Sequence, residues 1–321
     1  MFTLSRLILA AAAFVCGTSV AQQYPTRPIR IITQFTPGTS TDIMARVAAR
    51  SLGASFGQQV IVDNRPGAGA TLGTEIGAKA NPDGHTLTMA VSSAFGINPT
   101  LYARLPYDAI KDFDPIINLA LTPQTLVASS VAPFKTLKEF VAAARDKPSA
   151  INYASLGSGS TSHLATEMFR AAAGIKINHI PFKGSAEAHT QLIGGQVPVM
   201  ADAIPATMPH IKSGRLRGLG IATLKRSSFL PDLPTIAESG YPGFEAVGWI
   251  GMAAPAQTPA AVLDKLNATL NHMLNEAEVK ERLNTPAFTP VGGTRKEFGD
   301  YMKAEIAKWG KAVKESGARV D

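Results

Sequence analysis

Two successive alternations of strand-like and helix-like segments constrain the fold more than any other feature of this sequence. The first alternation has expected strands at 28–35, 59–63 and 87–91, with one helix beginning near Thr41 and another before the third strand. The strands are short apolar runs, and the first helix carries apolar residues at helical spacing. This alternation predicts a mostly parallel sheet with helices on both faces.

A second alternation begins near Thr125. Its expected strands lie at 125–129, 152–154, 176–180 and 197–201, and its expected helices at 137–145, 163–173 and 186–193. Two such series predict two α/β lobes. The part of the chain after Pro259 is expected to contain only helices, at 261–275, 277–283 and 295–316, which pack back on the first lobe.

The domain prediction follows from this order of elements. The chain is expected to cross back between the lobes over 240–255, which makes the first lobe discontinuous. Lobe 1 is then 22–124 together with 247–321, and lobe 2 is 125–246.

The N-terminus has the three parts of a secretory signal peptide. Arg6 precedes an apolar stretch at 7–15, and small residues follow at 19–21. We predict a signal peptide over 1–21, cut after Ala21, and a periplasmic mature protein. A lipoprotein anchored at Cys16 is the alternative, and the bulky residues that precede this cysteine disfavour it.

Composition excludes several classes of protein. The single cysteine leaves with the signal peptide, so the mature chain has no disulfide or thiolate metal site. After Ala21 no apolar run approaches the roughly 20 residues needed to span a bilayer. Removing Arg6 lowers the net charge from +7 to +6, and the basic residues are scattered, whereas nucleic-acid binding would predict clustering. The excess indicates either a mild preference for anions or a solubility charge.

The segment 35–42 joins the first strand to the first helix. Ligands of open α/β sheets bind at the carboxyl ends of strands, and a helix N-terminus presents free N–H groups to an anion. Thr39, Ser40 and Thr41 therefore either contact a ligand or cap the helix, and the two roles are compatible.

The segment 155–163 has the same placement in the second series. Its glycines allow a close backbone approach, and Ser158, Ser160 and Thr161 offer hydroxyl donors. His163 is either a structural residue of the helix start or a ligand contact. Two anion-ready helix starts, one in each lobe, predict a cleft between the lobes; a flexible surface loop is the competing interpretation.

Asp202 ends the apolar strand at 197–201, again at a carboxyl edge. It either binds a polar ligand group or caps the segment that follows.

Catalytic signatures are missing from the sequence. There is no serine three residues before a lysine and no H-x-x-x-H pair among the six histidines. The glycine-rich stretch 67–73 is one residue too long for a dinucleotide fingerprint, and we interpret it as a structural turn. We expect no catalytic residue, metal or cofactor.

Several ordered segments together resemble a known family. They include YPTRPIRIITQFTPGTSTDIMAR, VIVDNRPGAGATLGTE, INYASLGSGSTSHLATEMF, HIPFKGSAEA, LIGGQVPVM and LPDLPTIAESGYPGFEA. The chain resembles the receptors of tripartite tricarboxylate transporters, also called Bug proteins, over essentially its whole mature length.

This resemblance implies a type II periplasmic-binding fold whose two lobes close on a ligand. It implies a carboxylate held by the two helix-start loops, partly through ordered waters, without metal or cofactor. The predicted ligand-binding residues are Phe35, Gly38, Thr39, Ser40, Asp42 and Ser93 from one lobe and Ser158, Ser160, Thr161, His163, Gly184 and Asp202 from the other.

Departures from the family pattern bear on the ligand. Gln34 stands where proline is common before Phe35, and Thr39 stands where the family often has a further glycine. Phe95 and Ala201 replace residues that are polar and aromatic, respectively, in many members. We expect these two changes to reshape the pocket toward an aromatic or longer carboxylate.

The expected mechanism is capture. Amide dipoles and hydroxyl groups neutralise the carboxylate, and binding to both lobes favours the closed state. The expected partner of the closed form is a membrane permease of the tripartite type, or else the periplasmic part of a signalling protein. We expect a monomer.

Overall fold

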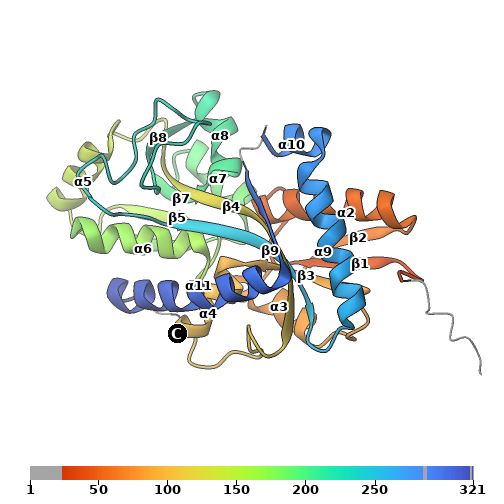
Figure 1. Ribbon diagram of the computed structural model, residues 1–321. Helices are drawn as coiled ribbons and strands as arrows, with labels where there is room; N and C mark the ends of the chain where they lie inside the picture. Colours follow the sequence, from red (N-terminus) through yellow and green to blue (C-terminus); the bar gives the residue numbers. More distant parts are fainter. Residues whose placement is uncertain (1–23, 285–287, 319, 321) are drawn as a thin grey trace, which may run out of the picture.

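The computed structural model describes residues 24–284, 288–318 and 320 (Figure 1). The predicted signal peptide over 1–21 lies outside the described residues.

The first half of the molecule is built on three parallel strands. β1 (Ile29–Thr33) lies between β2 (Val60–Asn64) and β3 (Thr86–Val91), and the connecting helices are α2 (Ser40–Phe56) and α3 (Thr71–Ala78). This confirms the first predicted alternation. β1 is shorter than expected, so that positions 34 and 35 lie beyond its end and are free to turn toward the helix.

The second half repeats this arrangement, again with the first strand of its series in the middle. β5 (Asn152–Ser155) lies between β6 (Asn178–Pro181) and β7 (Val199–Ala203), all parallel. The helices of this half are α5 (Leu137–Asp146), α6 (Thr161–Ala173), α7 (Ser185–Ile193) and α8 (Ile204–Lys212). The sequence predicted all of these helices except α8. This helix was missed because Pro205 and Pro209 interrupt its helical pattern in the sequence.

Two long strands run through the centre of the molecule and join the halves (Figure 1). The first part of β4 (Phe113–Ser129) pairs antiparallel with β9 (Val247–Pro255), and its last part pairs antiparallel with β7 and β8 (Leu216–Ile221). The sheet is therefore mixed, and the expectation of a mostly parallel sheet holds only within each half. The strand expected at 125–129 in fact begins at Phe113, and irregularities in the ladder on both sides of Ile117 accommodate Pro115.

The C-terminal helices agree with the prediction, but the segment between them does not. α9 (Ala260–Asn275), α10 (Ala277–Asn284) and α11 (Arg295–Ser316) form as expected. The expectation of a purely helical tail was wrong, because β10 (Thr289–Gly292) pairs antiparallel with β4. Its four residues include a proline, so no strand pattern marks it in the sequence.

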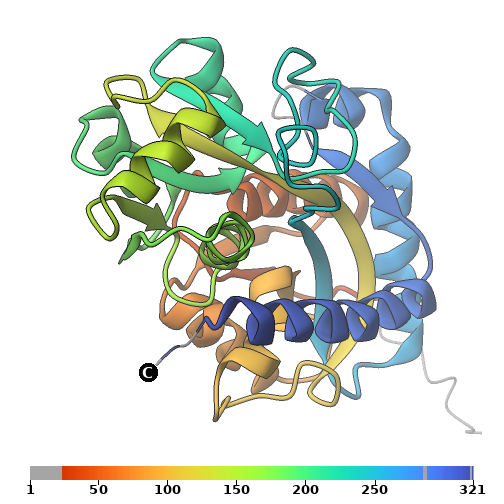
Figure 2. The same cartoon turned by 90° about the vertical axis from the view of Figure 1, so that its left-hand side faces the viewer.

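The last helix touches both halves of the protein. α11 packs against the helical turns that follow β3, namely η2 (Ser93–Ile97) and α4 (Asn98–Leu101), and also against α6 of the second half (Figure 2). Trp309 of α11 is 1% exposed and belongs to the buried cluster of the second half.

The halves also meet where the predicted turn at 67–73 approaches the second glycine-rich loop. The turn contains a short helix, η1 (Ala68–Ala70), in which Gly69 has φ 57°. A Cβ atom at Gly69 would lie 2.0 Å from the carbonyl oxygen of Ser158. We call this contact of Gly69 and Tyr102 with Ser158 the seam.

Candidate functional site

The segment between β1 and α2 is a capped helix start. Thr39 has an extended backbone, and its Oγ1 accepts a hydrogen bond from the amide of Asp42 at 3.4 Å. Gly38 has φ 86°, and its amide donates to Asp42 Oδ2 at 3.0 Å. The predicted capping role is confirmed. Ser40 is buried, and its Oγ has no hydrogen-bond partner among the described residues.

Asp42 is fully engaged within its own half. Its carboxylate accepts hydrogen bonds from Arg46 Nε at 2.9 Å and from Asn64 Nδ2 at 3.0 Å. Burial alone would raise the pKa of Asp42, but the hydrogen bonds from Arg46, Gly38 and Asn64 hold it below its ordinary value. This charge fixes the loop rather than facing the space between the halves.

The second glycine-rich loop has the same construction. Ser160 is the N-cap of α6, and its Oγ accepts from the amide of His163 at 3.1 Å. The two N-cap residues, Thr39 and Ser160, share nearly the same backbone conformation. Gly159, with φ 82°, donates its amide to His163 Nδ1 at 3.2 Å. The sequence prediction of two matched helix starts is therefore confirmed.

A ladder of stacked rings supports the second loop from behind. His163 stacks on His179 with ring centroids 4.2 Å apart, and His179 stacks on Tyr153 at 5.0 Å. Because Nδ1 of His163 accepts the Gly159 amide, this nitrogen carries no proton. Burial lowers the pKa of His163, and burial together with the neighbouring His163 charge lowers the pKa of His179 to about 4.

We expect this ladder to make stability pH-dependent. A histidine with a lowered folded-state pKa stabilises the protein above its unfolded pKa near 6.5, and that contribution is lost as the pH falls toward the folded pKa. Glu167 and Arg170 are the other ionic groups that act on these rings, and they oppose each other. Denaturant midpoints measured from pH 8 to pH 4 should fall most steeply between about pH 6.5 and pH 4.

The control separates the ladder from ordinary acid denaturation. His179→Phe keeps a ring in the stack and removes one titrating group, so its midpoint should fall less over this interval than that of the wild type. His272→Gln changes an exposed residue, with its side chain 79% exposed, and should follow the wild type. Parallel curves for the wild type and His179→Phe would contradict the assignment.

The two helix starts face one small cavity of about 50 Å³. Such a volume holds about three to five water-sized groups. Seven of the predicted ligand-binding residues line it, namely Phe35, Thr39, Ser40, Ser93, Ser160, Thr161 and Asp202. The structure thus brings together the helix starts of both halves, as the sequence predicts.

The other five predicted residues do not line this cavity: Gly38, Asp42, Ser158, His163 and Gly184. The first two complete the cap of α2, and His163 lies in the ring ladder. The remaining two lie where the halves touch. Ser158 belongs to the seam, and a Cβ atom at Gly184 would lie 1.8 Å from Thr36 Oγ1.

Thr41, for which ligand contact and capping were both left open, also lines the cavity. Sequence reasoning missed the other nine residues of the wall: Val91, Ser92, Thr122, Gln124, Leu156, Ser162, Ala203, Trp249 and Ile250. Ser92 is the most informative of them. Its Oγ lies 2.9 Å from Thr161 Oγ1, which joins the halves across the cavity, and it accepts from the Trp249 amide at 3.3 Å. The position of Ser92 directly after β3 could have marked it as a candidate site residue, because ligands of open α/β sheets bind at the carboxyl ends of strands.

The electrostatics of the cavity come from the backbone. No positively charged side chain lines it. The N-termini of α2 and α6 supply partial positive charge and free amides, and Ser40 adds an unpartnered hydroxyl. An anion small enough to fit would meet donors from both halves.

Asp202 is the single ionisable residue of the cavity wall, and the second half already binds its oxygens. It lies within β7 and accepts from Ser185 Oγ at 2.7 Å and from the Ala203 amide at 2.8 Å. His189 Nε2 lies 3.2 Å from Asp202 Oδ2, without hydrogen-bond geometry. Asp202 therefore ties the starts of α7 and α8 to the cavity floor, in keeping with the capping role left open by the sequence.

The two residues expected to reshape the pocket do not line it. Phe95 is fully buried and packs on Phe113 with ring centroids 4.8 Å apart. Ala201 is buried, and its carbonyl oxygen accepts a hydrogen bond from Ser162. The reason given from the sequence for a longer or aromatic ligand was therefore wrong, because both residues pack in the core.

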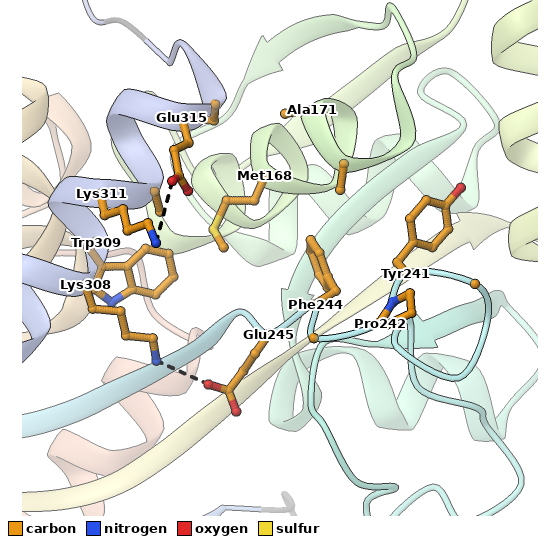
Figure 3. Close-up of a pocket in the computed structure, with 15 residues that line it drawn as sticks. Met168, Ala171, Tyr241, Pro242, Phe244, Glu245, Lys308, Trp309, Lys311 and Glu315 are labelled. Atoms are coloured by element: carbon orange, nitrogen blue, oxygen red, sulfur yellow. Dashed lines mark hydrogen bonds and ion pairs between the residues drawn. The ribbon is translucent and has the colours of Figure 1, made fainter.

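A larger hollow of about 740 Å³ lies between α6, α11 and the segment 240–245 (Figure 3). Its charged side chains pair with one another, Lys308 with Glu245 at 3.4 Å and Lys311 with Glu315 at 3.7 Å. None of the predicted ligand-binding residues lines it. We therefore place the candidate site in the small cavity between the helix starts.

Within the described part of the chain, no group of three or more histidine, cysteine or acidic residues could hold a metal ion. No helix among these residues combines the length and the apolar character needed to cross a bilayer.

The two α/β halves, joined by crossing strands around a cavity between helix starts, define the class of two-lobed solute-binding proteins. Comparison with known proteins agrees. The family model described as "Tripartite tricarboxylate transporter family receptor" matches residues 44–318. The chain belongs to this family, which is one of receptors rather than enzymes.

Relatives and solved structures support this assignment. Protein BugT of Bordetella pertussis is 38% identical over 314 residues, which cover 98% of this chain and 96% of that protein. The structure of R. palustris Rpa4515 with adipate is similar with a TM-score of 0.90 and 34% identity, covering 92% of this chain and 100% of that one. MatC from Rhodopseudomonas palustris with bound malate has a TM-score of 0.86 and 30% identity, covering 90% and 100%.

Proposed function

We propose that this protein is a periplasmic receptor that captures a small carboxylate between its two lobes for a membrane permease of the tripartite tricarboxylate type. The observation that carries the proposal is the cavity between the starts of α2 and α6. Its donors come from both lobes, and the N-termini of these two helices supply partial positive charge where the described wall carries no cationic side chain. The similar structures with adipate and malate support a carboxylate as the ligand.

We further propose that the predicted lobes, 22–124 with 247–321 and 125–246, move relative to each other on β4 and β9. Contacts at Ser92 and Thr161 and at the seam would then form only in the closed state. The ligand favours that state because it contacts both helix starts at once. The receptor acts as a monomer, and the closed surface is what the permease binds.

Thermal melting against a panel of acids tests this function. The mature protein should be stabilised by about 2.7 kcal/mol at a ligand concentration 100 times the dissociation constant. We expect such an increase in melting temperature with at least one of malate, succinate, adipate and benzoate. The proposal is wrong if no mono- or dicarboxylate shifts the melting of protein from which bound ligand has been removed by unfolding and refolding.

A single substitution then locates the ligand. Ser40→Ala removes a buried hydroxyl that has no protein partner, so the ligand-free protein should melt at the wild-type temperature. Affinity for the stabilising acid should fall by about tenfold, because a hydrogen bond to a charged group is lost. Ser51→Ala, on the same helix but outside the cavity, is the matched control and should bind as the wild type does.

A further inference from the structure

A second chamber adjoins the ligand cavity. It is a partly open hollow of about 620 Å³, and both lobes contribute to its wall. Pro66 and Tyr102 line it from the first lobe, and Pro181 and Phe182 line it from the second. We call it the outer chamber, and the cavity between the helix starts the inner cavity.

Two side chains separate these spaces. Phe35 and Leu156 line both the inner cavity and the outer chamber, so together they form the partition between them. Phe35 comes from the loop before α2, and Leu156 comes from the loop before α6. The partition is therefore made of one apolar side chain from each lobe, next to the helix starts that line the inner cavity.

We propose that the outer chamber binds the apolar body of an elongated acid whose carboxylate lies in the inner cavity. This inference rests on the proposed function, because it assumes that the carboxylate binds at the helix starts. The inner cavity has room for about three to five water-sized groups. It can hold a carboxylate with one or two carbons, whereas the body of a longer acid must pass between Phe35 and Leu156.

The chemistry of the outer chamber fits such a body. Its wall is largely apolar, and among the residues that the structure describes no acidic side chain lines it. Lys183 is the one charged side chain of these residues in the wall. Tyr102 also lines the chamber, and its hydroxyl already donates a hydrogen bond to the carbonyl oxygen of Ala68 at 3.1 Å. A hydrocarbon chain or an aromatic ring can therefore move from water into the chamber without burying an unpaired carboxylate of its wall.

Titration calorimetry with straight-chain monocarboxylates from acetate to decanoate tests the inference. These acids share one head group and differ only in the length of the body. Beyond butanoate, affinity should rise by about fourfold for each methylene group that enters the outer chamber. An affinity that stays constant or declines beyond butanoate would overturn the inference.

A variant of the outer chamber assigns the effect to its wall. Phe182 lines the outer chamber only. Phe182→Ala should weaken octanoate binding by about tenfold and leave propanoate binding unchanged. Phe229→Ala removes another half-buried phenylalanine of the second lobe, which lines neither space, and should bind both acids as the wild type does. Equal weakening of both acids by Phe182→Ala would show a general effect on the loop and would overturn the assignment.

The same measurements separate this inference from the proposed function. Failure to bind any acid of any length contradicts the receptor function itself. Binding of short acids alone leaves the receptor function standing and removes only the role of the outer chamber.

Discussion

Replacing Gly69 with alanine should weaken ligand binding by about 5- to 150-fold, because the added methyl group obstructs the closed state. The new Cβ would lie 2.0 Å from the carbonyl oxygen of Ser158 and 3.0 Å from the hydroxyl of Tyr102. Forcing such a contact costs about 1–3 kcal/mol in a packed site. The open state avoids this contact, so the substitution destabilises only the closed state. Because the ligand binds the closed state, its affinity falls by the same free energy. Titration calorimetry with an acid found in the melting panel measures the effect.

The matched control for Gly69→Ala is Gly57→Ala. Gly57 also has a left-handed backbone, with φ 64°, but nothing lies within 4 Å of its added Cβ. Both substitutions should lower stability by about 1 kcal/mol through backbone strain. Only Gly69→Ala should lower affinity, and equal affinities for the two variants would show that the seam plays no part in closure.

Trp249→Ala should lower the free energy of unfolding by about 3–5 kcal/mol, the largest stability effect that we expect from one substitution. Trp249 lies in β9, is fully buried, and packs edge-on against Phe298 and Tyr301 of α11. Truncation would leave a cavity where the crossing strand meets the last helix. Urea denaturation of the ligand-free protein measures the loss.

Trp249→Phe is the comparison that identifies packing as the cause. Nε1 of Trp249 has no hydrogen-bond partner, so phenylalanine loses no bond and fills most of the space. Its loss should be about 1–2 kcal/mol. Losses of the same size for alanine and phenylalanine would mean that packing against α11 is not what Trp249 contributes.

The elements that the sequence predicts well are those whose pattern is local. The strands and helices of each half and the three C-terminal helices appear as apolar runs or helical periodicity. β8 was missed because Gly218 and Gly220 weaken its strand pattern. The structure explains both glycines, since a Cβ atom would lie 2.6 Å from Leu233 at the first position and 2.9 Å from Ile236 at the second. Such close approaches depend on the fold and leave no mark in the local sequence.

The residues of the candidate site also differ in whether a local sequence pattern marks them. Ser40, Ser160 and Thr161 could be predicted, because a helix start after a strand has a recognisable sequence. Gln124 and Trp249 could not, because they reach the cavity from crossing strands whose pairing is long-range. The family resemblance placed Asp42 at the ligand, whereas the structure shows its carboxylate bound by the side chains around it.

The pairing of β3 with β9 has a consequence for the order in which the chain can fold. Met89 lies beside Met252, so the sheet of the first lobe is incomplete until the chain has been made well beyond its middle. Contacts between residues so distant in sequence slow folding, because a large loop must close before they form. The strand that completes the first lobe thereby also sets the earliest moment at which the receptor can become compact.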